Sequence, residues 1–243
     1  MSQPAVSALA SLPFELVTSD GEPLETNWHV IQMNLLIDLI HQAMTERGRS
    51  GFFAGGDMFV YYSYEQARDV AGGRPYFRGP DVFYVGDVEE RRERKAWVAW
   101  EEGGRLPDVI IELLSPSTAK IDRTVKKDLY SSVFHTPEYF LYEPDTWRLD
   151  GFRLKGERYQ SLTPNAHGRL WSEELGLEIG LWQGTQRAQE ATWARLFHPD
   201  GSLVPTPAER AEAERQRAEA ERQRAEAAEA ELKRLRALLE GRT

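Results

Sequence analysis

The stretch PDVIIELLSPS, residues 107–117, decides the fold of this chain. Its middle is a continuous apolar run, which is typical of a central strand covered on both faces of a sheet. Successive strand residues point to opposite faces, so Glu112 shares a face with Asp108, two pleats away, whereas Ile111 points the other way. An ionised carboxylate at Glu112 is costly to bury unless a cation or a hydrogen-bond donor meets it. The stretch therefore predicts a buried strand over 109–114 that carries an acidic group in need of a partner.

The flanking segments alternate between strand and helix patterns, which predicts a mixed α/β (α+β) domain. Further strands, punctuated by Gly-Gly pairs, are expected at Met58–Tyr62, Asp81–Val85, Tyr139–Tyr142 and Trp147–Leu154. A wide apolar arc predicts a first helix from about Thr26 to Arg47 that is buried on more than one side. A second helix is expected between the strands at 109–114 and 139–142, because Val125, Leu129 and Val133 recur at intervals of four.

The composition changes abruptly at Pro205, which predicts a domain over 1–205 and an appendage over 206–243. Residues 208–228 are almost wholly Ala, Glu, Arg and Gln, with a period of seven, and their helix propensity is very high. A helix of this length would span roughly 50 Å. Only the last two heptads, with Leu232, Leu235 and Leu239, have a convincing apolar seam. A lone solvated helix and a true coiled coil are both open interpretations.

Composition excludes several classes of protein. Of 243 residues 41% are hydrophobic, which is enough for a sizeable core and rules out wholesale disorder. Cysteine is absent, which excludes disulfides, thiolate zinc sites and a cysteine nucleophile, so a reducing cytoplasm is the expected compartment. No run approaches the roughly 18 apolar residues of a membrane span, and Met1–Leu12 lacks the basic start of a secretory signal.

The net charge of −9 lies entirely within 1–205, because 206–243 holds nine acidic and nine basic side chains. Such an acidic core argues against a protein that coats nucleic acid by bulk electrostatics. It leaves room for an enzyme that holds cations at a carboxylate site and meets DNA with a local basic patch. The phosphate-loop, dinucleotide, zinc-protease and serine-hydrolase motifs GxxxxGK[ST], GxGxxG, HExxH and GxSxG are all missing.

Carboxylates on apolar strands are the most informative chemical feature. Asp81 opens a predicted strand directly after Pro80, and together with Glu112 it would form a hard-oxygen site suited to Mg²⁺. Lys126 follows fourteen residues after Glu112 on the next helix. Two carboxylates and a lysine are the parts of metal-assisted phosphodiester hydrolysis. The plainer alternatives are a salt bridge for Glu112, a solvated surface position for Lys126 and a turn cap for Asp81.

Four blocks resemble, in order and content, a bacterial restriction endonuclease family (Uma-type) of the PD-(D/E)xK nuclease superfamily. They are PDVFYV (80–85), WEEGGRLPDVIIELLSPST (100–118), DRTVKKDLY (122–130) and PEYFLYEP (137–144). The similarity runs from about Glu25 to Leu203 and includes the habit of ending in an Ala/Glu/Arg-rich helix. It implies a restriction-endonuclease-like mixed central sheet flanked by helices, and an endonuclease that cuts DNA with Mg²⁺ or Mn²⁺.

The resemblance also implies roles for single residues. Asp81 is the Asp of PD and Glu112 the acidic residue of (D/E)xK, and both are expected to hold the metal. The lysine expected two residues after Glu112 is Leu114 here, and the family's displaced lysine corresponds to Lys126, with Lys127 as the second choice. Tyr130, at i+4 from Lys126, is expected to brace it.

Three further residues are weaker candidates. Glu25 and His29 match the first-helix element of the family, where an acid joins the metal site. Their alternative roles are stabilisation of a helix N-terminus by charge, and simple packing. Asp108 lies roughly 13 Å along the strand from Glu112. It is expected at most to contact the site residues, and not the metal itself.

The sequence leaves the DNA contact and the assembly open. The basic cluster in EERRERKAWVAWEEG (89–103), with Arg91, Arg92, Arg94 and Lys95, is either a phosphate-contacting loop or a solvated helical turn with internal Glu–Arg pairs. The rival to an enzyme is a non-catalytic nuclease-fold scaffold, or an interaction protein, assembled through its C-terminal helix. A homodimer is the expected assembly, and a protein partner bound by that helix is the alternative.

Overall fold

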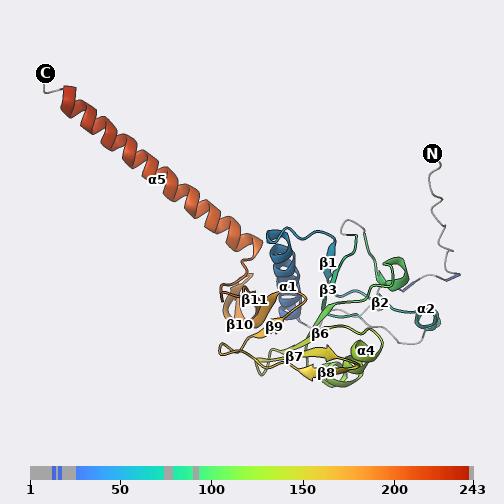
Figure 1. Ribbon diagram of the computed structural model, residues 1–243. Helices are drawn as coiled ribbons and strands as arrows, with labels where there is room; N and C mark the ends of the chain where they lie inside the picture. Colours follow the sequence, from blue (N-terminus) through green and yellow to red (C-terminus); the bar gives the residue numbers. More distant parts are fainter. Residues whose placement is uncertain (1–12, 15, 18–25, 74–78, 90–92, 241–243) are drawn as a thin grey trace, which may run out of the picture.

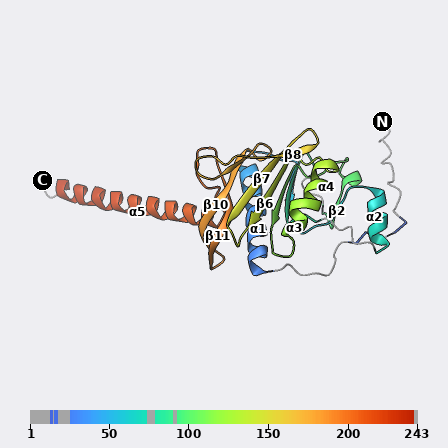
Figure 2. The ribbon, with the colours of Figure 1, turned by 90° about the horizontal axis from the view of Figure 1, so that it is seen from below.

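The computed structural model describes residues 13–14, 16–17, 26–73, 79–89 and 93–240, except for the side chains of 235 and 237–240. Its centre is a six-stranded sheet in the order β1-β3-β5-β6-β7-β8 (Figures 1 and 2). These strands are β1 Phe52–Gly55, β3 Val82–Gly86, β5 Val109–Leu113, β6 Glu138–Glu143, β7 Arg148–Lys155 and β8 Arg158–Ser161. Strands β5 and β6 pair in parallel and the other pairs are antiparallel. The mixed central sheet is thereby confirmed.

Two smaller sheets and several helices complete the domain. The smaller sheets comprise β9 Leu170–Ser172, β10 Leu177–Gln186 and β11 Gln189–Phe197, and the parallel pair β2 Val60–Tyr61 and β4 Trp97–Val98. The helices of the domain are α1 Asn27–Glu46, α2 Tyr64–Ala71, the 3₁₀ turn η1 Ala99–Glu101, α3 Ala119–Ile121, the π-helical turn η2 Asp122–Lys126 and α4 Lys127–Ser132. Strands β1, β4 and β8 to β11 are not among those that the sequence predicts.

Strand β5 separates two layers of apolar packing. Val109 and Ile111 belong to a core shared with α1 and the β9–β11 sheet, whereas Ile110 packs with Tyr130 and Phe134 on the opposite face. Figure 2 shows α1 on one side of the central sheet, with α3 and α4 on the other. The alternation predicted for this strand is confirmed, and it places Glu112 on the face covered by α3, η2 and α4.

The helical segment 119–132 presents Asp122 and Lys126 to the sheet. Of the predicted stripe, Val125 is 51% exposed and Val133 is 42% exposed, whereas Leu129 is half-buried and packs against the core. Asp122 and Tyr130 are buried on the inner side. Apolar spacing alone therefore identifies only part of the inner face. A π-helical turn such as η2 is rare and is often found at functional sites.

The last helix, α5 (Pro207–Glu240), extends away from the domain as a single long arm (Figure 1). Its first turn is fixed by a capping box, in which Glu209 N donates to Thr206 Oγ1 (3.1 Å) and Thr206 N donates to Glu209 Oε2 (2.7 Å). The Glu209 carboxylate also takes two hydrogen bonds from the fully buried Arg195. Within the described residues, no helix has the length and apolar character needed to cross a membrane.

Candidate active site

Asp81 and Glu112 meet where β3 and β5 pair. Val82 is paired with Ile111 in the antiparallel register, so Asp81 and Glu112 are the next residues along the two strands. Asp81 N donates to Glu112 Oε2 (3.3 Å), and Leu113 N donates to Asp81 Oδ2 (2.6 Å). The two carboxylates are thus held side by side by the backbone of the opposite strand.

Lys126 reaches this pair from the end of η2. Its Nζ lies 3.1 Å from Glu112 Oε1 and 2.8 Å from Asp122 Oδ1. The Lys126 side chain is only 17% exposed and that of Glu112 is fully buried, so Lys126 is not a solvated surface residue. Tyr130 Oη donates to Glu112 Oε1 (2.9 Å). The expectation that Tyr130 braces Lys126 is therefore wrong, because its hydroxyl contacts the acid instead.

Asp122 is a third acid in this cluster, and it is absent from the sequence-based candidates. Its side chain is 2% exposed, and Tyr139 Oη donates to its backbone carbonyl (3.0 Å). The available signal was its i,i+4 spacing to Lys126 in DRTVK, which places the two side chains on one side of a helix. We call Asp81, Glu112, Asp122 and Lys126 the carboxylate–lysine cluster.

Burial dominates the electrostatics of the cluster. It raises the pKa of Glu112 to about 8, with the Lys126 ammonium opposing that shift and the charges of Asp81 and Asp122 adding to it. Burial likewise raises the pKa of Asp81. Burial would lower the pKa of Lys126, but the charges of Glu112, Asp122 and Asp81 outweigh it, and the pKa lies above its ordinary value. With all groups ionised the cluster carries three negative charges and one positive charge, so it is short of positive charge.

His29 supports the cluster from the α1 side of the sheet. Its Nε2 lies 3.2 Å from the Leu113 carbonyl and its Nδ1 lies 3.0 Å from Thr26 Oγ1. A carbonyl only accepts, so Nε2 carries the hydrogen and Nδ1 accepts from the Thr26 hydroxyl when the ring is neutral. His29 thus binds the carbonyl of Leu113, the residue whose N–H group binds Asp81. Glu25 lies outside the described residues.

Comparison with family models gives a match over residues 10–194 to a family described as "Putative restriction endonuclease" (Uma2). The match spans β3, β5 and the Lys126 turn, and it ends before α5. The chain belongs to the Uma2 family. A search of curated proteins found no match to it.

Asp108 does not support the site of this Uma2 protein, contrary to the expectation from its strand face. It lies just before β5, at the end of the strand away from Glu112, where it accepts from Gly86 N (2.7 Å) and from Arg105 Nη2 (2.9 Å). Within the described part of the chain it bonds to no member of the carboxylate–lysine cluster. Its pairing with Arg105 gives it a structural role.

The basic segment of this Uma2 protein provides less charge for DNA than its sequence suggests. Arg94 forms a buried ion pair with Glu102 (2.9 Å), and its guanidinium lies over the rings of Phe53 and Trp97. This bond is one of the internal Glu–Arg pairs that the second interpretation expects, but the Arg94 side chain is only 2% exposed and so is not solvated. Arg91 and Arg92 lie outside the described residues.

The donor chemistry of the cluster fits Mg²⁺. Carboxylate oxygens are the ligands that Mg²⁺ prefers, and it often takes only one or two of them while keeping several waters. Among the described residues there is no set of three or more His, Asp or Glu side chains that converges on a common metal position. Asp81 and Glu112 could supply two carboxylates to such an ion, whereas Asp122 Oδ1 is paired with Lys126 Nζ.

Proposed function

We propose that this Uma2 protein is a Mg²⁺-dependent DNA endonuclease that hydrolyses phosphodiester bonds at the carboxylate–lysine cluster. The observation that carries the proposal is the convergence of Asp81, Glu112 and Lys126 from two strands and a helix, with Lys126 Nζ 3.1 Å from Glu112 Oε1. Membership of a family described as restriction endonucleases supports a nuclease with DNA as its substrate.

Each residue of the cluster would have a distinct role in the reaction. Asp81 and Glu112 would hold Mg²⁺, or Mn²⁺ in its place, and the bound ion would neutralise the phosphate and activate water. Lys126 has a raised pKa and stays protonated, so its ammonium would orient the attacking water and stabilise negative charge rather than remove a proton. Asp122 and Tyr130 would hold Lys126 and Glu112 in position.

The test is a cleavage assay on plasmid and single-stranded DNA with Mg²⁺, Mn²⁺ or EDTA. We expect cleavage with either metal and none in EDTA, and we expect Asp81→Asn and Glu112→Gln each to abolish it. Calorimetric titration with Mg²⁺ should show binding to the wild type that both variants lose. A protein that binds no metal and cuts no DNA would instead be a non-catalytic scaffold with a nuclease fold.

The exposed arm supports a second proposal, which concerns assembly. Helix α5 is bonded to the domain near its start, through Glu209 and Arg210, and its described side chains are exposed. A helix so exposed gains stability when its apolar seam packs against another helix. We propose that α5 joins two copies of the chain as a coiled coil, with a helix of another protein as the alternative partner.

A further inference from the structure

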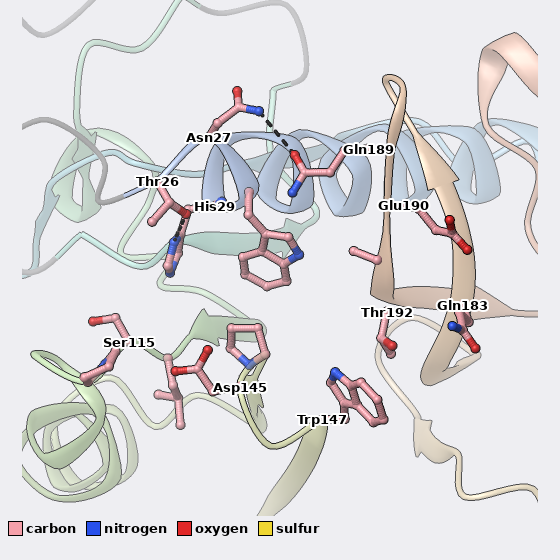
Figure 3. A pocket seen from close by; sticks show the side chains of 15 residues that line it. Thr26, Asn27, His29, Ser115, Asp145, Trp147, Gln183, Gln189, Glu190 and Thr192 are labelled. Carbon is pink, nitrogen blue, oxygen red and sulfur yellow. Dashed lines mark hydrogen bonds between the residues drawn. The ribbon is translucent and has the colours of Figure 1, made fainter.

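A cavity of about 790 Å³ lies on the α1 side of the central sheet (Figure 3). Its walls are the start of α1, the segment after β5, the turn between β6 and β7, and the β10–β11 hairpin. His29 belongs to both places, because it lines the cavity and its Nε2 bonds the Leu113 carbonyl. Leu114 and Ser115 also line the cavity and follow Glu112 by only two and three residues. The cavity is thus linked to the cluster through His29 and the residues that follow Glu112.

The lining of the cavity selects against phosphate. Its described residues include no lysine or arginine, and they include the carboxylates of Asp145 and Glu190. Negative charge at these two positions repels a nucleic-acid backbone. The remaining polar lining is mainly amide, with Gln183 and Gln189 on the hairpin, and apolar rings and prolines fill the rest of the wall. Within the described residues, the side chains of Asp145, Glu190 and Gln183 form no hydrogen bond or ion pair. They are free to bind an incoming group.

Trp147 holds an aromatic face at the edge of the cavity. Its side chain is 65% exposed, and its backbone has φ of 52°, in the left-handed region that a bulky residue rarely adopts. In Figure 3 it lies across the cavity from Asn27. An exposed indole gains nothing from the hydrophobic core, whereas a flat aromatic face is the group on which unpaired bases stack.

We propose that this cavity, the Trp147 cavity, binds an unpaired base of the DNA substrate. The base stacks on Trp147 and its exocyclic amine donates to the carboxylates and amides of the wall, while its phosphates stay outside near the cluster. Adenine, cytosine and guanine present an amino group and thymine does not. DNA with unpaired bases is thus the preferred substrate class, with oligo-dT the weakest single strand. The inference rests on the proposed nuclease function, which it refines.

The experiment separates the cavity from catalysis by measuring binding and cleavage independently. Fluorescence anisotropy with labelled dC12, dT12 and a matched duplex, in Ca²⁺ and in EDTA, would report binding. The key variant is Trp147→Gly, because glycine adopts the left-handed backbone freely and the fold is kept. Trp171→Ala is the matched control, since Trp171 is 40% exposed on β9 and does not line the cavity.

We expect the wild type to prefer dC12 over dT12 and over the duplex, and Trp147→Gly to weaken dC12 binding by about tenfold or more. Trp171→Ala should bind like the wild type. Equal binding of dC12 by the wild type and Trp147→Gly would overturn the inference, whether or not Mg²⁺-dependent cleavage occurs. Binding that depends on Trp147 without any cleavage would support the cavity and remove the nuclease function. Trp147-dependent binding of an oligoarginine peptide without binding of dC12 would also overturn the inference.

Discussion

Glu112 is held by three donors from two separate parts of the chain. Lys126 and Tyr130 approach one of its oxygens and the backbone N–H group of Asp81 approaches the other. A buried carboxylate is tolerated only when its hydrogen-bonding and charge requirements are met in this way. The remaining excess of negative charge in the cluster is what a divalent cation would neutralise.

The raised pKa of Glu112 predicts a distinctive pH dependence of stability in the metal-free protein. The pKa rises on folding from 4.5 to about 8, so the folded state holds a proton that the unfolded state has lost between these values. The resulting stabilisation is complete below the unfolded pKa and is lost as pH rises through about 8. The slope is at most about 1.4 kcal/mol per pH unit. Thermal unfolding in EDTA from pH 5 to 9 should show a steeper decline for the wild type than for Glu112→Gln.

The control for that comparison is Glu157→Gln, which removes one charge from an exposed position on the turn between β7 and β8. It should retain the wild-type slope. Parallel curves for the wild type and Glu112→Gln would mean that Glu112 is already ionised in the folded protein at neutral pH.

Replacement of Lys126 should affect both catalysis and stability. Lys126→Ala leaves Glu112 and Asp122 without their cation, so we expect a loss of about 3 kcal/mol in the free energy of unfolding in EDTA. Cleavage should fall by roughly 100-fold or more. Mg²⁺ should restore part of the melting temperature, because it replaces the missing positive charge. Lys127→Ala is the matched control, since the Lys127 ammonium lies over the Phe152 ring at 3.4 Å from its centroid. Equal losses of cleavage in the two variants would contradict the assignment of Lys126.

Among the elements, the segment α3–η2–α4 owes its orientation to its polar residues. Its inner side carries Asp122, Lys126 and Tyr130, and its outer side carries the exposed Val125 and Val133. Burying charged side chains is favourable here only because Glu112 on β5 is their partner. The helix and the strand therefore depend on each other, and the site is part of what holds them together.

The start of α5 is predicted to contribute to the stability of the domain. Glu209 takes two hydrogen bonds from Arg195, whose side chain is fully buried, and closes the capping box with Thr206. Glu209→Ala should therefore lower the free energy of unfolding by roughly 2 kcal/mol. Glu212→Ala, three residues further on an exposed part of the helix, should change it by less than about 0.5 kcal/mol. Chemical denaturation of both variants measures the difference, and equal values would show that the Arg195 contact is not stabilising.

At the scale of the whole molecule, metal binding at the carboxylate–lysine cluster should not depend on helix α5. Deleting 215–243 keeps the anchored first turns, so we expect unchanged metal binding and weaker self-association. In the full chain, Leu232→Glu combined with Leu235→Glu should reproduce the weaker association, because like charges cannot pair in a helix–helix seam. Sedimentation measures the mass in each case. If the mass stays that of the wild type, the arm does not join copies of this chain.

The sequence by itself determined the elements whose signal is local. The apolar run at 109–113 predicts β5 and its two faces, and the wide apolar arc predicts α1 almost to its observed ends. High helix propensity predicts α5. In each case the pattern repeats over a few neighbouring residues. Its physical cause is either burial of one face or intrinsic helix propensity, and both act between residues that are close in the sequence.

Only the tertiary structure decided which polar side chains meet. Asp122 joined the cluster, Asp108 paired with Arg105 at the far end of the strand, and Arg94 turned into the interior. These contacts join residues on different elements. They form because a buried charge is stable only when it is paired, and apolar spacing carries no information about that pairing. Val125 points outward for the same reason. Lys126 faces the sheet to pair with the buried Glu112, and Val125 beside it is left exposed.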